Sequence, residues 1–256
     1  MNDAPAPISI QLYTLREEVN ADFPAVLRRL AAKGYAGVEL AGFGALTPAQ
    51  LAAVLAETGL AVSSAHVGYQ PADGFAAALA DHRTLGCDTA VIPALRADGF
   101  ADLDAVQKSA DRVNGLVDVA RAHGMTLGYH NHFWEFTPMP DGRPALLHLF
   151  ERLDPAVFAE VDIYWAQVGG SDPAALVSEL GTRVRLLHVK DGPADEPPSP
   201  MVAVGDGVID VPGVLEAAPG ARWHIVELDR CATDMFDAVE RSYDFLVGGG
   251  YSRGRA

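Results

Sequence analysis

The chain has few basic residues, few cysteines and no long apolar run, and each of these shortages excludes a class of protein. Its 19 lysine and arginine residues face 34 aspartate and glutamate residues, so the formal net charge is −15. We expect no nucleic-acid partner, because phosphate binding depends on a basic surface that releases counterions. We expect no membrane-spanning helix, because no run of 18 apolar residues is present. Cys87 and Cys231 are too few for a disulfide framework.

The first residues, MNDAPAPISI, contain neither the basic segment nor the apolar segment of a secretory signal. We therefore expect a soluble cytoplasmic protein. Hydrophobic residues make up 49% of the 256 residues and charged residues 21%, which suffices for a large core. The length matches that of one α/β barrel. The sequence predicts a single domain over residues 1–256, with a loose tail from about 248 to 256.

Short β-rich runs alternate with longer amphipathic runs along the whole chain. Strands that are apolar on both faces indicate a parallel sheet, whose neighbouring strands need helical crossovers. No GxGxxG motif follows the first strand, so a dinucleotide-binding sheet has no support. Eight strand-helix units in this length favour a closed (β/α)8 TIM barrel. The predicted strands lie near residues 8–14, 36–42, 60–68, 89–95, 125–132, 158–166, 184–191 and 223–229.

Several helix boundaries can be predicted from the residues at their ends. Thr47, Pro48 and Gln50 have the spacing of a capping box at the start of the second helix. Asp22 is the expected N-cap of the first helix. One long helix is predicted from about 101 to 123.

Polar residues gather at or just past the predicted strand ends, where TIM barrels have their active sites. A charged group inside an apolar strand is costly unless it is paired or binds a metal. A single histidine or glutamate there is more often part of a satisfied core, and Glu39 and His66 are open to both interpretations. A chance gathering of several such residues at one rim is much less expected. The residues are Gln11, Tyr13, Glu39, His66, His130, His132, Glu135, Asp162, His188, Lys190, Glu227 and Asp229.

Four of these residues have the chemistry of a divalent-metal site. Glu135, Asp162, His188 and Glu227 supply three carboxylates and one imidazole. Such an oxygen-rich set favours Mn²⁺, Mg²⁺ or Co²⁺ over a thiolate zinc site. A metal held there would polarise a carbonyl and a neighbouring hydroxyl of a sugar-like substrate. Carboxylates on either side could then move a proton at the carbon next to the carbonyl.

Six motifs carry a family resemblance that covers nearly the whole chain. In order, GYAGVEL, YHNHFWEF, VDIYWA, HVKD, VGDGVID and IVELD resemble the sugar phosphate isomerase/epimerase superfamily, whose barrel is xylose isomerase-like, in its HNHxxEF branch. In the ketose 3-epimerases of this superfamily, Glu, Asp, His and Glu from strands 5 to 8 hold one divalent ion. The resemblance gives Asp162, His188 and Glu227 the last three places. We assign the first place to Glu135; the alternative is that His130 takes it and Glu135 contacts substrate.

The resemblance implies a metal-dependent isomerase or epimerase that acts on a sugar or keto-sugar. The expected cofactor is one divalent ion, with Mn²⁺ as first choice and Mg²⁺ or Co²⁺ as alternatives. An alternative activity is that of a dehydratase or lyase of an inosose or 3-keto-sugar, and a remote alternative is a non-catalytic sugar-binding protein. Homo-oligomerisation stays open. The expected catalytic residues are Glu135, Glu227, His130 and Lys190, and the expected substrate contacts are Gln11, Glu39, His66, His132, Trp165 and Asp229.

The glycine-rich segment VGDGVID, residues 204–210, has two interpretations. It could be a simple turn after the seventh strand. It could also bring backbone amides close to a sugar oxygen or a phosphate of the substrate. No basic cluster surrounds it, so a phosphorylated substrate is not required.

Overall fold

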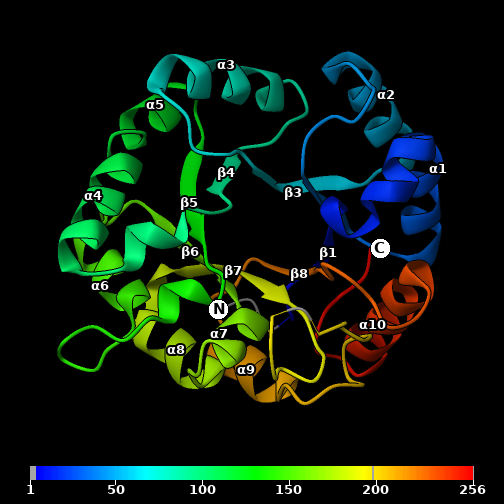
Figure 1. Cartoon of the computed structure of the whole chain (residues 1–256). Helices are drawn as coiled ribbons and strands as arrows, with labels where there is room; N and C mark the ends of the chain where they lie inside the picture. The colour runs from blue at the N-terminus through cyan, green and yellow to red at the C-terminus, as the bar shows by residue number, and fades with distance from the viewer. Residues whose placement is uncertain (1–3, 198, 256) are drawn as a thin grey trace.

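The computed structural model describes residues 4–197 and 199–255. Within these ranges eight parallel strands form a closed barrel, in which each strand pairs with the next and β8 pairs with β1 (Figure 1). The predicted single TIM barrel is therefore confirmed. The strands are β1 (Ile8–Gln11), β2 (Gly37–Leu40), β3 (Ala61–His66), β4 (Thr89–Ile92), β5 (Thr126–His130), β6 (Phe158–Asp162), β7 (Val184–Val189) and β8 (Trp223–Val226).

The helices form a ring outside the barrel (Figure 1). None in the described ranges combines the length and the apolar character needed to cross a bilayer. The α-helices are α1 (Arg16–Lys33), α2 (Pro48–Thr58), α3 (Ala72–Arg83), α4 (Leu103–Asn114), α5 (Val117–Ala122), α6 (Ala145–Arg152), α7 (Ile163–Val168), α8 (Pro173–Leu180), α9 (Val211–Ala217) and α10 (Met235–Gly248). Short 3-10 turns are η1 (Leu12–Leu15), η2 (Ala97–Phe100), η3 (Trp134–Phe136) and η4 (Gly181–Arg183).

The predicted helix ends hold in two cases and shift in one. Thr47 and Gln50 form the expected reciprocal capping box of α2. Asp22 has a non-helical backbone and caps the predicted helix, since its carboxylate accepts from the amide of Ala25. The residues before Asp22 are also helical, so α1 as a whole begins at Arg16 and is interrupted at Asp22. The long helix expected over 101–123 is divided into α4 and α5.

The barrel interior is layered, because every second residue of a strand points inward. The lowest layer is an apolar floor made of Val91, Phe158, Leu186 and Ile225. The ring of Phe158 fills the space beside Gly128, where an added Cβ would lie 2.4 Å from it. Two residues further along β5, β6 and β7, the inward positions become polar, and they stay polar to the rim. The ionisable groups are therefore stacked above an apolar floor.

The described residues after α10, up to Arg255, contact the rest of the chain in the region where a loose tail was expected from about 248 to 256. Its backbone at Arg253 exchanges hydrogen bonds with Ala6 and Ile8, of 3.0 and 2.9 Å. The guanidinium of Arg255 donates to the carbonyl of Thr58 at 2.6 Å. Ser252 is buried and lies 2.8 Å from Nδ1 of His224. These contacts fasten the end of the chain beneath the barrel.

Removal of residues 251–256 is expected to lower the free energy of unfolding by about 2–4 kcal/mol, since several buried polar groups lose their partners. Urea unfolding of the full chain, the shortened chain and the Arg255→Ala variant checks this. The substitution is expected to have an intermediate effect. An unchanged midpoint in the shortened chain would mean that the tail is loose after all.

Candidate functional site

The polar layers form two clusters of buried groups that share two histidines. The outer cluster, near the rim, is His130, Asp162, His188 and Glu227. The inner cluster, below it, is His66, His130, Glu160 and His188. In each cluster the potential ligand atoms all lie within 4.8 Å of one another.

Lys190 supplies the positive charge of the outer cluster. Its Nζ lies 2.9 Å from Asp162 Oδ2, 2.7 Å from Glu227 Oε2 and 2.8 Å from Asp229 Oδ2. His188 Nδ1 is also 2.7 Å from Glu227 Oε2. All of these groups except Asp229 are almost completely buried, so their attraction is weakly screened.

Asp162 is held by its neighbours on both sides. The side-chain amide of Asn131 accepts from the backbone N–H of Asp162 and donates to its carbonyl, which fastens β5 to β6. Oδ1 of Asp162 caps α7 by accepting from the amide of Trp165 at 2.9 Å. Oδ2 accepts no hydrogen bond and is the oxygen that faces the cluster.

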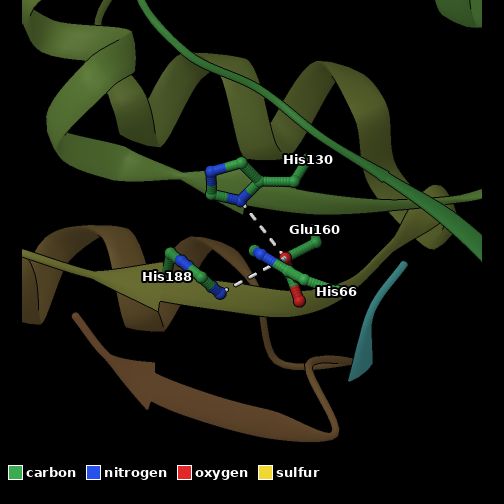
Figure 2. Close-up of side chains that lie close together, drawn as sticks. All are labelled: His66, His130, Glu160 and His188. Carbon is green, nitrogen blue, oxygen red and sulfur yellow. Dashed lines mark hydrogen bonds and ion pairs between the residues drawn. The ribbon is translucent and has the colours of Figure 1, made fainter. Parts of the chain in front are cut away.

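The inner cluster is centred on the Glu160 carboxylate (Figure 2). Its Oε2 lies 2.7 Å from His66 Nε2, 3.2 Å from His130 Nδ1 and 3.2 Å from His188 Nε2. Glu39 lies beside the cluster, 2.7 Å from His188 Nε2.

Glu39 is itself fixed from behind. It accepts hydrogen bonds from Gln11 Nε2 at 2.6 Å and from Ser64 Oγ at 2.5 Å. The register explains these contacts, since Gln11 and Ser64 are the strand partners of Glu39. Gln11 was expected to contact substrate, and the structure places it, fully buried, behind Glu39.

The electrostatic environment gives His188 a different protonation state from His130 and His132. Burial alone would lower the pKa of His188, but Glu160, Glu39 and Glu227 outweigh it and hold the pKa well above its ordinary value. Burial together with the charge of His188 holds the pKa of His130 well below its ordinary value. Burial also lowers the pKa of His132, to about 3. His188 is therefore cationic in this arrangement, whereas His130 and His132 are neutral.

The buried carboxylates also differ from one another in the direction of their pKa shifts. Burial raises the pKa of Asp162 to about 6, with Lys190 opposing it. Burial and the charge of Glu39 raise the pKa of Glu160 to about 7. For Glu227, burial is outweighed by Lys190 and His188, which hold its pKa well below the ordinary range.

Glu135 is not part of either cluster. Its carboxylate accepts from the Tyr129 hydroxyl at 2.7 Å and from the His132 amide at 3.0 Å, and it is fully buried. Asp162, His188 and Glu227 are brought together as expected, but the residue of β5 beside them is His130. Of the two interpretations of the first ligand place, the geometry favours His130, because both oxygens of Glu135 are already engaged.

An aromatic wall borders the outer cluster. The His132 ring is stacked on Trp134 with a centroid distance of 4.3 Å and lies 6.4 Å from Trp165. Lys190 Nζ is 5.3 Å from the centre of the Trp165 ring. Nε1 of both tryptophans and Nδ1 of His132 are buried without a hydrogen-bond partner in the described part of the chain. The wall thus offers apolar faces together with unused polar atoms.

Sequence reasoning missed Glu160, although a signal for it was present. Glu160 precedes Asp162 by two residues on β6, so the alternation of a strand places both inside the barrel. Glu160 lies one inward position below the end of β6, deeper than the residues at the strand ends.

The segment VGDGVID is built around Asp191. The Asp191 carboxylate accepts from the amides of Gly192, Gly205, Gly207 and Ile209 at 2.8–3.1 Å. A Cβ at Gly207 would lie 2.0 Å from Asp191 Oδ1, which explains the glycine. These amides therefore bind Asp191, which supports the turn rather than the substrate-binding interpretation.

Ionisable residues at the C-terminal rim of a closed parallel barrel are the arrangement of TIM-barrel enzymes. Residues 27–231 match the family described as xylose isomerase-like TIM barrel, and the chain belongs to this family. The resemblance to the sugar phosphate isomerase/epimerase superfamily is thereby confirmed.

The relatives of the chain include enzymes named for sugar chemistry. A 2-epi-5-epi-valiolone 7-phosphate 2-epimerase from an Actinoplanes species is 32% identical over 133 residues, which are 51% of this chain and 47% of the relative. The match thus spans about half of that relative. The structure of a sugar phosphate isomerase/epimerase from Parabacteroides distasonis is 26% identical, with a TM-score of 0.83, over 98% of this chain and 97% of that one.

A third relative shares the fold alone. The probable 3-DHS dehydratase AsbF from Bacillus anthracis is 12% identical, with a TM-score of 0.76, over 94% of this chain and 98% of that one.

The buried Glu135 gives a prediction about pH. Burial raises its pKa to about 7, above the ordinary 4.5, so the fold favours the protonated carboxyl. Its contribution to the free energy of unfolding is complete below pH 4.5 and is lost as the pH rises to 7. Glu135→Gln cannot ionise, so its stability relative to the wild type should rise by about 3 kcal/mol across this window.

Urea unfolding in EDTA at several pH values measures the difference in free energy of unfolding between Glu135→Gln and the wild type. The exposed Glu216 supplies the matched control, Glu216→Gln, measured in the same way. Parallel curves for Glu135→Gln and the wild type would contradict the assignment.

Asp191→Ala is expected to lose about 3 kcal/mol of stability, because four backbone N–H groups lose their acceptor. The matched control is Asp206→Ala in the same loop, which removes only a surface ion pair with Arg241 and should change stability by less than about 0.5 kcal/mol. Thermal and urea unfolding distinguish them. Equal effects of the two substitutions would show that the loop does not depend on Asp191.

Proposed function

We propose that the protein is a divalent-metal-dependent isomerase or epimerase that moves a proton at the carbon next to the carbonyl of a sugar or keto-sugar. The observation that carries this proposal is the outer cluster, in which two carboxylates and two imidazoles converge at the rim with a buried ammonium beside them. The names of the Actinoplanes and Parabacteroides relatives support the same class of reaction.

The outer cluster fits a divalent ion. His130, Asp162, His188 and Glu227 would hold it, with Asp162 Oδ2 facing the cluster, where its present neighbour is the Lys190 ammonium at 2.9 Å. The mixed oxygen and nitrogen donors suit Mn²⁺, with Mg²⁺ and Co²⁺ as alternatives. When bound, the ion supplies Lewis acidity toward the carbonyl oxygen of the substrate.

Glu227 is suited to carry the proton. Burial would raise its pKa, but Lys190 and His188 outweigh burial and hold the pKa well below its ordinary value. Glu227 is therefore unprotonated near neutral pH, as a proton acceptor must be, and a carboxylate that holds an ion through one oxygen keeps a second oxygen for the proton. His130 is neutral because it is buried, which suits it as a ligand. Glu227 directly follows β8 and His130 ends β5, with β6 and β7 between them, so they approach the cluster from different sides.

Lys190 acts in this proposal as a fixed donor to a developing oxyanion. Burial opposes its charge, but Asp162, Asp229 and Glu227 hold its pKa well above the ordinary value. An ammonium that retains its proton so firmly is a poor acid for expelling a hydroxyl group, yet it stabilises negative charge on oxygen well. This favours isomerisation or epimerisation over the alternative of dehydration.

The aromatic wall suits a polyol substrate. Trp134 and Trp165 can pack against the apolar face of a sugar ring. Their free N–H groups, and the free Nδ1 of His132, would be satisfied by hydroxyl groups of the substrate. In this proposal Glu135 positions His132 through its amide instead of touching substrate.

Proton NMR in D₂O tests the proposal. The Mn²⁺-loaded protein is incubated with a panel of ketohexoses, ketopentoses and inososes, and manganese is removed before the spectra are recorded. The wild type should exchange the hydrogen next to the carbonyl of at least one compound. Glu227→Gln should slow the exchange by about 100-fold or more, whereas the exposed Glu216→Gln should not change it.

Ultraviolet absorbance of the same mixtures separates the alternatives. A dehydratase would form a conjugated, absorbing product, and an isomerase would not. Metal content, measured in parallel, shows whether each variant still carries its ion. A loaded wild type that exchanges no hydrogen and forms no absorbing product across the panel would leave the sugar-binding protein as the better interpretation.

A further inference from the structure

The inner cluster contains polar atoms that the fold leaves unsatisfied. Glu160 is completely buried, and its Oε1 has no hydrogen-bond partner in the described part of the chain. Nδ1 of His130 is likewise buried and without one, although it points toward Glu160. A buried polar atom without a partner costs free energy, and a ligand bound to Glu160 Oε1 and His130 Nδ1 would remove that cost.

The inner cluster contains no lysine, and the positive charge that faces its carboxylates is that of imidazoles, His188 above all. The ion pairs of Glu39 and Glu160 in the described ranges are all with imidazoles, those of His66, His130 and His188. Two carboxylates thus lie in a buried space without a lysine or arginine among their described partners. A divalent cation would compensate them directly.

The ring of His188 is oriented as the ring of a metal-bound histidine usually is. Its Nε2 faces Glu160, whereas its Nδ1 lies 2.7 Å from Glu227 Oε2. A ligating histidine typically donates its other ring N–H to a carboxylate, which fixes the ring. Glu39, held by Gln11 and Ser64, supplies a further carboxylate next to the same nitrogen.

We propose that the inner cluster is a second cation site, in which His66, His130, Glu160 and His188 bind one divalent ion of the zinc or cobalt type. Three imidazoles and one carboxylate make a donor set richer in nitrogen than the outer cluster, and such a set suits Zn²⁺ and Co²⁺. The inference goes beyond the proposed function, since it holds whether or not the outer cluster binds an ion. The two sites are coupled, because His130 and His188 each face both clusters.

Titration with Co²⁺ gives a readout that does not depend on activity. A cobalt ion with three nitrogen ligands and one carboxylate in a four-coordinate site absorbs strongly in the visible range, whereas a six-coordinate oxygen-rich site absorbs weakly. The wild type should develop the strong band. Glu160→Gln and His66→Asn should lose it or bind Co²⁺ at least about tenfold more weakly, and Asp162→Asn, which alters only the outer cluster, should keep it.

Thermal unfolding establishes that each variant is folded. As a test without substitution, wild-type crystals soaked in Co²⁺ are expected to show an anomalous peak among the four side chains of the inner cluster. Co²⁺ binding that Glu160→Gln and His66→Asn leave unchanged, or an anomalous peak confined to Asp162 and Glu227, would overturn the inference. Those results would leave the proposed function intact. Conversely, a protein that binds an ion in the inner cluster but shows no isomerase activity would count against the proposed function and not against the second cation site.

Discussion

The site depends on one imidazole held between two carboxylates. Glu39 and Glu227 lie 2.7 Å from the two ring nitrogens of His188; Glu227 directly follows the neighbouring strand β8, and Glu39 belongs to β2 across the barrel. The ring is completely buried, so both contacts act in a weakly screened interior. They fix the plane of the ring, and with it the direction in which each nitrogen can meet an ion. The orientations of the inner and outer clusters are thus set by the same side chain.

The stacking of these groups follows from two elementary features of the barrel. Alternation along β6 directs Phe158, Glu160 and Asp162 inward in succession, so one strand contributes to the floor and to both clusters. The other feature is parallel pairing, which brings His130 next to Glu160 and Asp162 next to His188. Apolar burial at the floor compensates for the polar groups above it, and ion pairs neutralise most of their charge.

The architecture was largely predictable from the sequence, because it depends on local patterns. Eight apolar runs with intervening amphipathic segments permit few topologies, and the capping box of Thr47 and Gln50 fixes a helix start locally. The helical segment before Asp22 and the docking of the tail were not predicted in this way. Both depend on packing between distant segments, as the contact of Arg255 with Thr58 illustrates.

The sequence predicts the proximity of the candidate site residues best where residue chemistry and strand position agree. Asp162, His188 and Glu227 are at strand ends and meet as expected. The position of Glu135 was harder to foresee, since a 3-10 turn after β5 directs its carboxylate toward Tyr129. Glu160 could have been predicted from the alternation along β6, but its contact with His66 of β3 depends on spacing across the barrel that no local pattern reveals.

The floor has a consequence for how related sequences can vary. The Phe158 ring occupies the space that any side chain at position 128 would need. A larger residue in place of Gly128 therefore requires a smaller one in place of Phe158, or else the layer above it, with Glu160 and His130, is displaced toward the rim. The two positions should covary among homologues, even though neither touches an ion or a substrate.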